Sequence, residues 1–200
     1  LRSLVGSEMC IRDRYLFIRA FVRRRILHID DRSQLDIAVS NGLRIGKDCH
    51  VMGECIIDPG HCWLISIGDR VTLAPRVHIL AHDASTKREL GQTRLGCVSI
   101  GDDVFIGAGS IILPGIRIGN KVVIGAGSVV SRSIPDNSVA VGNPARVVGT
   151  YDAFIERKMQ EKNHYPCFDW TYTIGNITEE KRDEMQRFCL LYTSPSPRDS

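Results

Sequence analysis

Residues 100–130 read IGDDVFIGAGSIILPGIRIGNKVVIGAGSVV, and an aliphatic residue returns at every sixth position of this stretch. The six positions are Ile100, Ile106, Ile112, Ile118, Ile124 and Val130. The same spacing occurs upstream in two shorter runs, at Ile45, Val51 and Ile57 and at Ile67, Leu73 and Ile79. A period of six is neither the 3.6 of an α-helix nor the 2.0 of a simple strand. It predicts short strands that alternate with tight turns, so that like side chains stack from coil to coil.

Glycine placement supports this repeat. Half of the 18 glycines fall between Gly101 and Gly149, where tight turns would need small residues or a positive φ. Three hexads would make one triangular coil, and stacked coils would bury a continuous core with contacts only between neighbours. Because aromatic residues make up only 6% of the chain, that core must consist of Ile, Val, Leu and Ala. The expected fold class is an all-β solenoid with short N- and C-terminal helices.

The bulk composition excludes several classes of protein. With 43% apolar and 24% charged residues, the 200-residue chain can fold, and a net charge of +3 does not indicate a nucleic-acid partner. No apolar run approaches the roughly 18 residues of a membrane span, so we expect a soluble protein. Seven cysteines without a C-x-x-C pair or a secretory signal fit reduced thiols in a cytoplasmic protein. We expect these thiols to act as small apolar residues and expect no metal site.

The repeat frame divides the chain into five parts. Residues 1–14 and 190–200 follow no periodicity and resemble translated adaptor sequence, so we exclude them from the fold. Residues 15–34 predict an N-terminal helix, mainly Tyr15 to Asp30, and residues 35–150 predict the solenoid. Residues 151–189 predict a helical extension, with helices near 150–159 and 178–188.

Two insertions interrupt the hexads. Ile57 and Ile67 are ten residues apart, and the extra residues include Asp58, His61 and Trp63. Ile79 and Ile100 are twenty-one residues apart, and His82 stands near the start of that longer insertion. Because solenoids accept insertions at coil corners, such loops commonly form the binding face.

The chain resembles a known family over about residues 35–150. The segments IGDRVTLAPRVHILAHDASTKRELGQTR (67–94), VSIGDDVFIGAGSIILPGIRIG and VVIGAGSVVSRSIPDNSVAVGNPARVV follow the order of hexapeptide-repeat acyltransferases. They are similar to the maltose and galactoside O-acetyltransferase-like branch. The resemblance implies a left-handed parallel β-helix, although ordinary crossovers are right-handed. It also implies a homotrimer that uses acetyl-CoA as co-substrate to acetylate a hydroxyl of a saccharide.

His82 is the expected catalytic residue. A sugar hydroxyl is a poor nucleophile until a base removes its proton, and a neutral imidazole suits this role near pH 7. The family's catalytic histidine also lies at the start of this loop. Asp58 and Asp83 are candidates to orient the imidazole or to bind the acceptor. Trp63 is a candidate to stack on a sugar ring, with filling of a coil corner as the alternative.

The expected donor site combines small residues with one arginine. Gly107, Ala108, Gly125 and Ala126 would let the pantetheine arm approach the backbone, although hexads need small residues there in any case. The resemblance adds Phe105 and Ser131 as donor contacts. It also places Arg146 of the GNPARVV segment at the nucleotide phosphates, which suits a guanidinium. Some relatives carry a second basic residue where this chain has Gly149, and Lys121 or Arg132 are candidates to compensate.

Three alternatives remain at this point. A γ-type carbonic anhydrase would need three histidines from neighbouring coils, and this chain has none between residues 83 and 163. A non-enzymatic β-helix would not explain the GNPARVV segment or a histidine at the mouth of a long insertion. An amino-sugar nitrogen could replace the hydroxyl as acceptor. The basic residues of the expected N-terminal helix could contact a membrane surface weakly, with packing on the trimer as the alternative.

Overall fold

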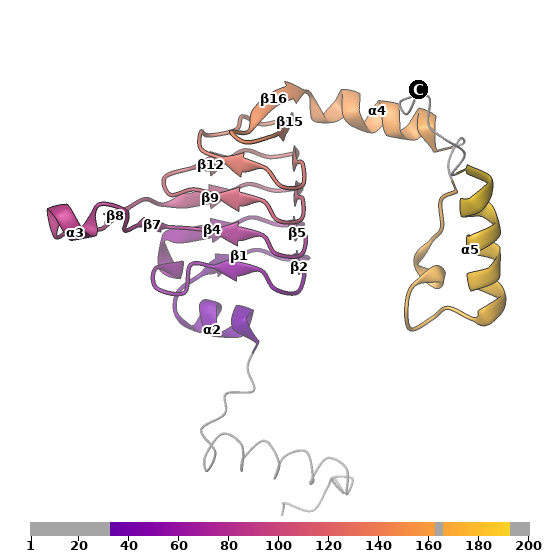
Figure 1. The fold of residues 1–200 in the computed structure, drawn as a ribbon, viewed down its shortest axis with the longest axis horizontal. Helices are drawn as coiled ribbons and strands as arrows, with labels where there is room; N and C mark the ends of the chain where they lie inside the picture. Colours follow the sequence, from indigo (N-terminus) through magenta and orange to yellow (C-terminus); the bar gives the residue numbers. More distant parts are fainter. Residues whose placement is uncertain (1–32, 163–165, 193–200) are drawn as a thin grey trace, which may run out of the picture.

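The structure, a computed structural model, describes residues 33–162 and 166–192. Short strands stack into a solenoid with three sheets of parallel strands, and each of the first four coils contributes one strand to each sheet (Figure 1). The period of six predicted the stacked coils, and the family resemblance predicted that their strands are parallel. The expected segment 1–14 and the expected helix over 15–30 lie outside the described residues, as does most of the tail 190–200.

The three sheets share the first four coils, and the second sheet continues with two further strands. The first consists of β1 (Arg44–Ile45), β4 (Ile65–Ile67), β9 (Val98–Ile100) and β12 (Arg117–Ile118). The second runs through β2 (His50–Val51), β5 (Thr72–Leu73), β10 (Val104–Ile106), β13 (Val122–Ile124), β15 (Ser138–Val141) and the antiparallel β16 (Arg146–Gly149). The third consists of β3 (Ile56–Ile57), β6 (His78–Ile79), β11 (Ile111–Ile112) and β14 (Val129–Val130).

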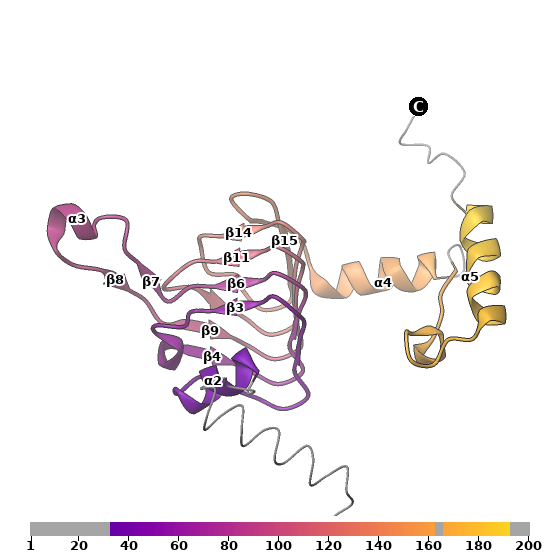
Figure 2. The same ribbon diagram turned by 60° about the horizontal axis from the view of Figure 1, so that its bottom comes forward.

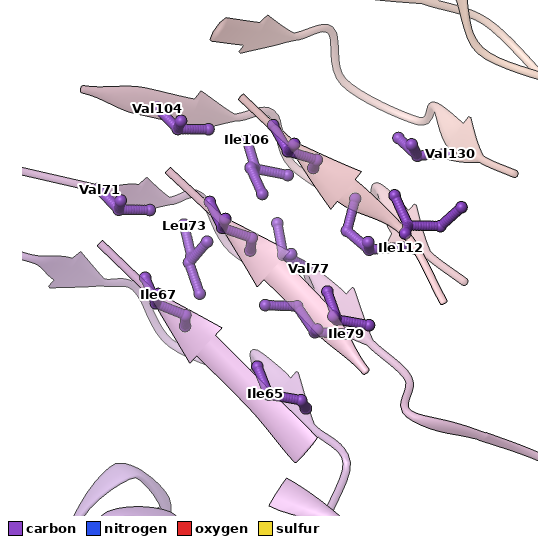
Figure 3. Close-up of a cluster of buried hydrophobic side chains, with 14 of the residues drawn as sticks. Ile65, Ile67, Val71, Leu73, Val77, Ile79, Val104, Ile106, Ile112 and Val130 are labelled. Carbon is purple, nitrogen blue, oxygen red and sulfur yellow. The ribbon is translucent and has the colours of Figure 1, made fainter. Parts of the chain in front are cut away.

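Each residue of the period-six frame is the last residue of a strand. In the third sheet, the register places Ile57 beside Ile79, Ile79 beside Ile112 and Ile112 beside Val130. These side chains meet those of the other two sheets in one aliphatic core (Figure 3). Leu73, Ile79, Ile106, Ile112 and Ile124 have no exposed surface. The prediction that like side chains stack from coil to coil is therefore confirmed.

The two ends of the solenoid are closed differently. Helix α2 (Gln34–Ser40) lies under the first coil, and Ser33 and Asp36 form a capping box at its start (Figure 1). Its Ala38 packs into the core together with Cys62, and Cys55 is buried too. The expectation that the thiols serve as small apolar residues therefore holds for Cys55 and Cys62 but not for Cys97, Cys167 and Cys189, which are exposed. At the other end β16 folds back against β15.

A helical arm follows β16. Helix α4 (Tyr151–Glu161) begins after the N-cap Thr150, leads away from the solenoid, and is followed by the 3-10 turn η2 (Trp170–Tyr172) and by α5 (Glu179–Tyr192) (Figure 1). Both helices lie close to their predicted positions. Phe168 contacts the rings of Tyr172 and Phe188, which ties η2 to α5. Among the described residues, no helix is long and apolar enough to cross a membrane.

Both insertions leave the solenoid at its corners. The shorter one forms the 3-10 turn η1 (Cys62–Leu64). The longer one forms a two-stranded antiparallel hairpin of β7 (His82–Asp83) and β8 (Arg94–Leu95), with α3 (Lys87–Leu90) at its tip. This hairpin projects well beyond the coils (Figure 2). The ladders of the three sheets therefore continue undisturbed past both insertions.

Gly107 marks a point where two coils come too close for a side chain. A Cβ added at Gly107 would lie 2.4 Å from the backbone nitrogen of Ala126 in the next coil. Gly53 occupies an exposed corner, where an added Cβ would meet nothing within 4 Å. The two glycines therefore differ in packing, although both belong to the turns of the solenoid.

We expect Gly107→Ala to lower the free energy of unfolding by about 1–3 kcal/mol, because a methyl group pressed against backbone must displace a coil. Gly53→Ala is the matched control and should change it by no more than about 0.5 kcal/mol. Chemical denaturation of both variants at one protein concentration measures the difference. Equal effects of the two substitutions would contradict the packing role given to Gly107.

Candidate active site

The register of the third sheet brings the two insertions together. Ile57 and Ile79 are neighbours in that sheet, and the backbone N–H of Asp58 donates to the carbonyl of Ile79 at 2.9 Å. Asp58 therefore begins its insertion directly beside the residues that lead into β7. His82, the first residue of β7, lies three positions after Ile79. The two residues belong to successive coils and meet at one corner.

Asp58 and His82 form a hydrogen-bonded pair. The Nδ1 atom of His82 lies 2.5 Å from Oδ2 of Asp58, whose side chain has no exposed surface. The same carboxylate accepts the backbone N–H groups of Ala81 at 2.8 Å, Gly60 at 3.1 Å and His61 at 3.1 Å. A buried carboxylate is costly unless it is hydrogen-bonded, and this one has four donors.

These hydrogen bonds favour the ionised form of Asp58 and set the tautomer of His82. Burial alone would raise the pKa of Asp58, but the hydrogen bonds from His82 and from the Ala81 N–H outweigh it and leave that pKa below its ordinary value. An ionised carboxylate only accepts hydrogen bonds, so Nδ1 of His82 must carry the proton that it donates. In the neutral ring Nε2 then has a free lone pair, which is the tautomer that a general base requires.

Of the two roles expected for Asp58, the geometry fits only one. A side chain without exposed surface cannot contact an acceptor directly, whereas its bond to His82 orients the imidazole. Asp83 lies on the exposed side of the hairpin, where its carboxylate accepts the N–H of Ser85 at 2.9 Å. This hydrogen bond is the main reason why the pKa of Asp83 is lowered. The carboxylate of Asp83 thus binds the backbone of the hairpin, whereas the carboxylate of Asp58 binds the ring of His82.

Three rings form a row beside the pair. The ring of His61 lies 5.0 Å from that of His82 and 5.4 Å from that of Trp63, between centroids. Trp63 is about half exposed, so its ring does not fill a corner of the core. His61 was not selected from the sequence. The signal that could have identified it is its position three residues after Asp58 in the same insertion.

A cavity of about 380 Å³ opens beside His82. Its wall includes Asp83 and Arg94 from the hairpin and Ser131, which follows β14 two coils further along. The His82 side chain is 35% exposed, so its ring is accessible from this cavity. The structure thus brings the expected base and one expected donor contact to the same hollow.

The other expected donor contacts lie elsewhere on the single chain. Ala108 lines an open hollow at another corner, together with Glu54 and Arg76. Phe105 lines a third hollow on the outer face of the second sheet, together with Tyr151 and Phe154 from the first turn of α4. One chain therefore does not gather these positions into one cavity.

The four small residues divide into two kinds. Ala108 and Ala126 are exposed and stack on adjacent coils, where the carbonyl of Ala108 accepts the N–H of Gly127 at 2.8 Å. Gly107 is buried, and an added Cβ at Gly125 would lie 2.7 Å from the side chain of Val141. Packing alone therefore explains the two glycines, whereas the two alanines offer surface to a ligand.

Arg146 is exposed on β16, at the end of the solenoid. Its Nη1 donates to the carbonyl of Ala145 at 2.9 Å, which leaves the outer edge of the guanidinium toward solvent. Lys121 and Arg132, the candidate substitutes for the basic residue replaced by Gly149, are exposed as well.

Asp58, His61 and His82 also form the one group of potential metal ligands found among residues 33–162 and 166–192. Each offers one ligand atom, and these atoms all lie within 4.8 Å of one another. The carboxylate that binds His82 therefore also lies close to the side chain of a second histidine, His61.

Comparisons with known proteins agree with this architecture. Residues 97–132 match the family model described as the hexapeptide repeat of succinyl-transferase. Protein CapG of Staphylococcus aureus is 40% identical over 129 residues, which cover 62% of this chain and 74% of that protein. The putative acetyltransferase YvoF of Bacillus subtilis is 39% identical over 93 residues, 46% of this chain and 52% of YvoF. This chain therefore spans only about half of YvoF.

A solved structure shows the same fold. The hexapeptide-repeat-containing acetyltransferase of Vibrio cholerae superimposes with a TM-score of 0.50 at 20% identity, over 74% of this chain and 94% of that one. The repeat frame, the family model and the similarity to CapG lead to one conclusion: the chain belongs to the hexapeptide-repeat acyltransferase family.

Proposed function

We propose that this protein transfers an acetyl group from acetyl-CoA to a hydroxyl of a saccharide or a saccharide-containing acceptor, on a left-handed β-helix. The observation that carries the proposal is the Asp58–His82 pair beside an open cavity at the mouth of the hairpin. The relative named a putative acetyltransferase supports the choice of acetyl donor.

The proposed reaction needs one base and no metal. Nε2 of His82 removes the proton of the acceptor hydroxyl as its oxygen attacks the thioester carbonyl. When the C–S bond breaks, the imidazolium gives this proton to the departing sulfur, so coenzyme A leaves as the thiol and Nε2 is a free base again. Asp58 keeps the proton of the ring on Nδ1 and stabilises the imidazolium that forms. Trp63 and Asp83, which are exposed near this corner, are the proposed contacts of the acceptor.

The donor is proposed to lie between subunits. Phe105, Ala108 and Ser131 border separate hollows of one chain, so a second wall is needed to join them into one crevice. Ala126 extends the exposed strip of Ala108, and Arg146 is proposed to hold the nucleotide phosphates. Exposed apolar side chains on the outer faces, such as those of Met52 and Ile56, support an interface with another copy.

His82→Ala should lower kcat by roughly 10²–10⁴, the usual contribution of a general base, and leave the Kd for acetyl-CoA unchanged. Asp58→Asn should also lower kcat, because an amide cannot stabilise the imidazolium by charge, although its effect should not exceed that of His82→Ala. Steady-state thiol release and calorimetry with acetyl-CoA measure the two constants.

Asp83→Asn is the matched control for Asp58→Asn, because both remove one carboxylate charge near the same histidine. It should leave kcat close to the wild-type value and act, if at all, on the KM for the acceptor. Normal turnover in His82→Ala would refute the catalytic assignment. A loss of kcat in Asp83→Asn equal to that in Asp58→Asn would refute the role given to the buried carboxylate.

Arg146→Ala should raise the KM for acetyl-CoA about tenfold to a hundredfold with kcat nearly unchanged. The phosphates are held equally in the ground state and the transition state, and a charged hydrogen bond contributes about 1.5–3 kcal/mol. Arg146→Lys should restore only part of the affinity, since an ammonium group cannot form a bidentate contact. A loss of turnover with intact donor binding would place the nucleotide elsewhere.

The protein should be a homotrimer in solution, because the proposed donor crevice is complete only between copies. Light scattering coupled to gel filtration, at micromolar concentration and with activity measured on the same fractions, tests this. A fully active monomer, or a stable closed dimer, would contradict the proposed placement of the donor.

A further inference from the structure

We propose that Asp58, His61 and His82 form a binding site for a divalent transition metal of the zinc class, and that its occupation inhibits the enzyme. One ligand atom of each residue lies within 4.8 Å of the others. Asp58 is fully buried, so its carboxylate differs from the exposed acidic groups that often lie together on protein surfaces. The binding step does not depend on the proposed acyl transfer, whereas the inhibition does.

His61 is the residue that points to a ligand. Its Nδ1 atom is buried and has no hydrogen-bond partner among the described residues. That atom lies 3.6 Å from Oδ1 of Asp58, which is too far for a hydrogen bond. Two ligands of one tetrahedral zinc ion, each about 2.1 Å from the metal, lie about 3.4 Å apart. The separation of these two atoms therefore suits a shared metal, which would satisfy the buried nitrogen.

The ligand set favours zinc or a neighbouring metal ion. Two imidazoles and one carboxylate are ligands that Zn²⁺ accepts, and three protein ligands leave a fourth position open to solvent or substrate. His82 is 35% exposed and borders the cavity, which gives an ion a path from solvent to the site. Magnesium and calcium prefer oxygen ligands and are not expected here.

Metal binding removes the base by a simple change of tautomer. At 2.5 Å, Asp58 and Nδ1 of His82 are too close to hold an ion between them, so their hydrogen bond must open. When Nδ1 binds the metal through its lone pair, the proton of the neutral ring resides on Nε2. Nε2 is then unable to accept the proton of an acceptor hydroxyl, and no proton is gained or lost in the exchange.

The full chain, freed of metal with a chelator and kept free of coenzyme A, is titrated with Zn²⁺ by calorimetry and with Co²⁺ by visible absorption. We expect one ion per chain. His61→Asn should weaken binding at least about tenfold, since loss of residues that merely support ligands already costs 10–100-fold. His50→Asn, an exposed histidine on β2, is the matched control and should leave the affinity unchanged.

Several outcomes would overturn the proposal. They are the absence of binding, equal affinity in His61→Asn, and thiolate-to-cobalt charge-transfer absorption, which would assign the metal to cysteines such as the exposed Cys97. If His61→Asn does not fold, the ring NMR signals of the wild-type protein decide, because Zn²⁺ must shift those of His61 and His82. Site-specific binding that leaves acetyl transfer unaffected would overturn the inhibition. Binding without any transferase activity would instead refute the proposed function alone.

Discussion

The structure depends on one constraint, the register between successive coils. Most strands are only two or three residues long, so no strand is stable by itself and each must pair with the coils above and below. The hydrogen bonds can form only if each coil presents the same position at the same corner. The aliphatic frame residue that ends the strand in each hexad satisfies this requirement, because its side chain fills the core between aliphatic side chains of the coils above and below, as Ile112 does between Ile79 and Val130.

The same register creates the candidate site. Insertions are tolerated at corners, where the chain leaves one sheet before entering the next, and both long insertions follow strands of the third sheet. Ile57 and Ile79 are 22 positions apart in the sequence but are paired in the sheet. The residues that follow each of them must therefore meet. Asp58 and His82 are thus brought together by the pairing of strands in the core. Their proximity is a consequence of the core rather than of the loops.

This explains what the sequence could and could not predict. The twelve frame residues could be identified because an aliphatic residue recurs at every sixth position. The corner insertions could be identified because they interrupt that spacing. The bond between Asp58 and His82 could not be identified, because Asp83 is adjacent to His82 in sequence whereas Asp58 is 24 residues away, and only the pairing of β3 with β6 brings Asp58 to the ring. His61 was missed because the direction of a ring in a short turn leaves no periodic signal. The spacing also could not show that Phe105, Ala108 and Ser131 border separate hollows of one chain, because it does not indicate which corners open to solvent.

The chemistry of His82 is ultimately set by backbone groups. Three of the four donors to the Asp58 carboxylate are N–H groups of Gly60, His61 and Ala81, which the turn before η1 and the approach to β7 hold in place. These donors keep the carboxylate ionised, and an ionised carboxylate determines which nitrogen of His82 carries the proton. A substitution that shifts either turn would therefore alter the tautomer without touching the ring. His61 is part of the turn before η1, so its side chain also lies beside the carboxylate, and the ring atom Nδ1 has no hydrogen-bond partner among the described residues.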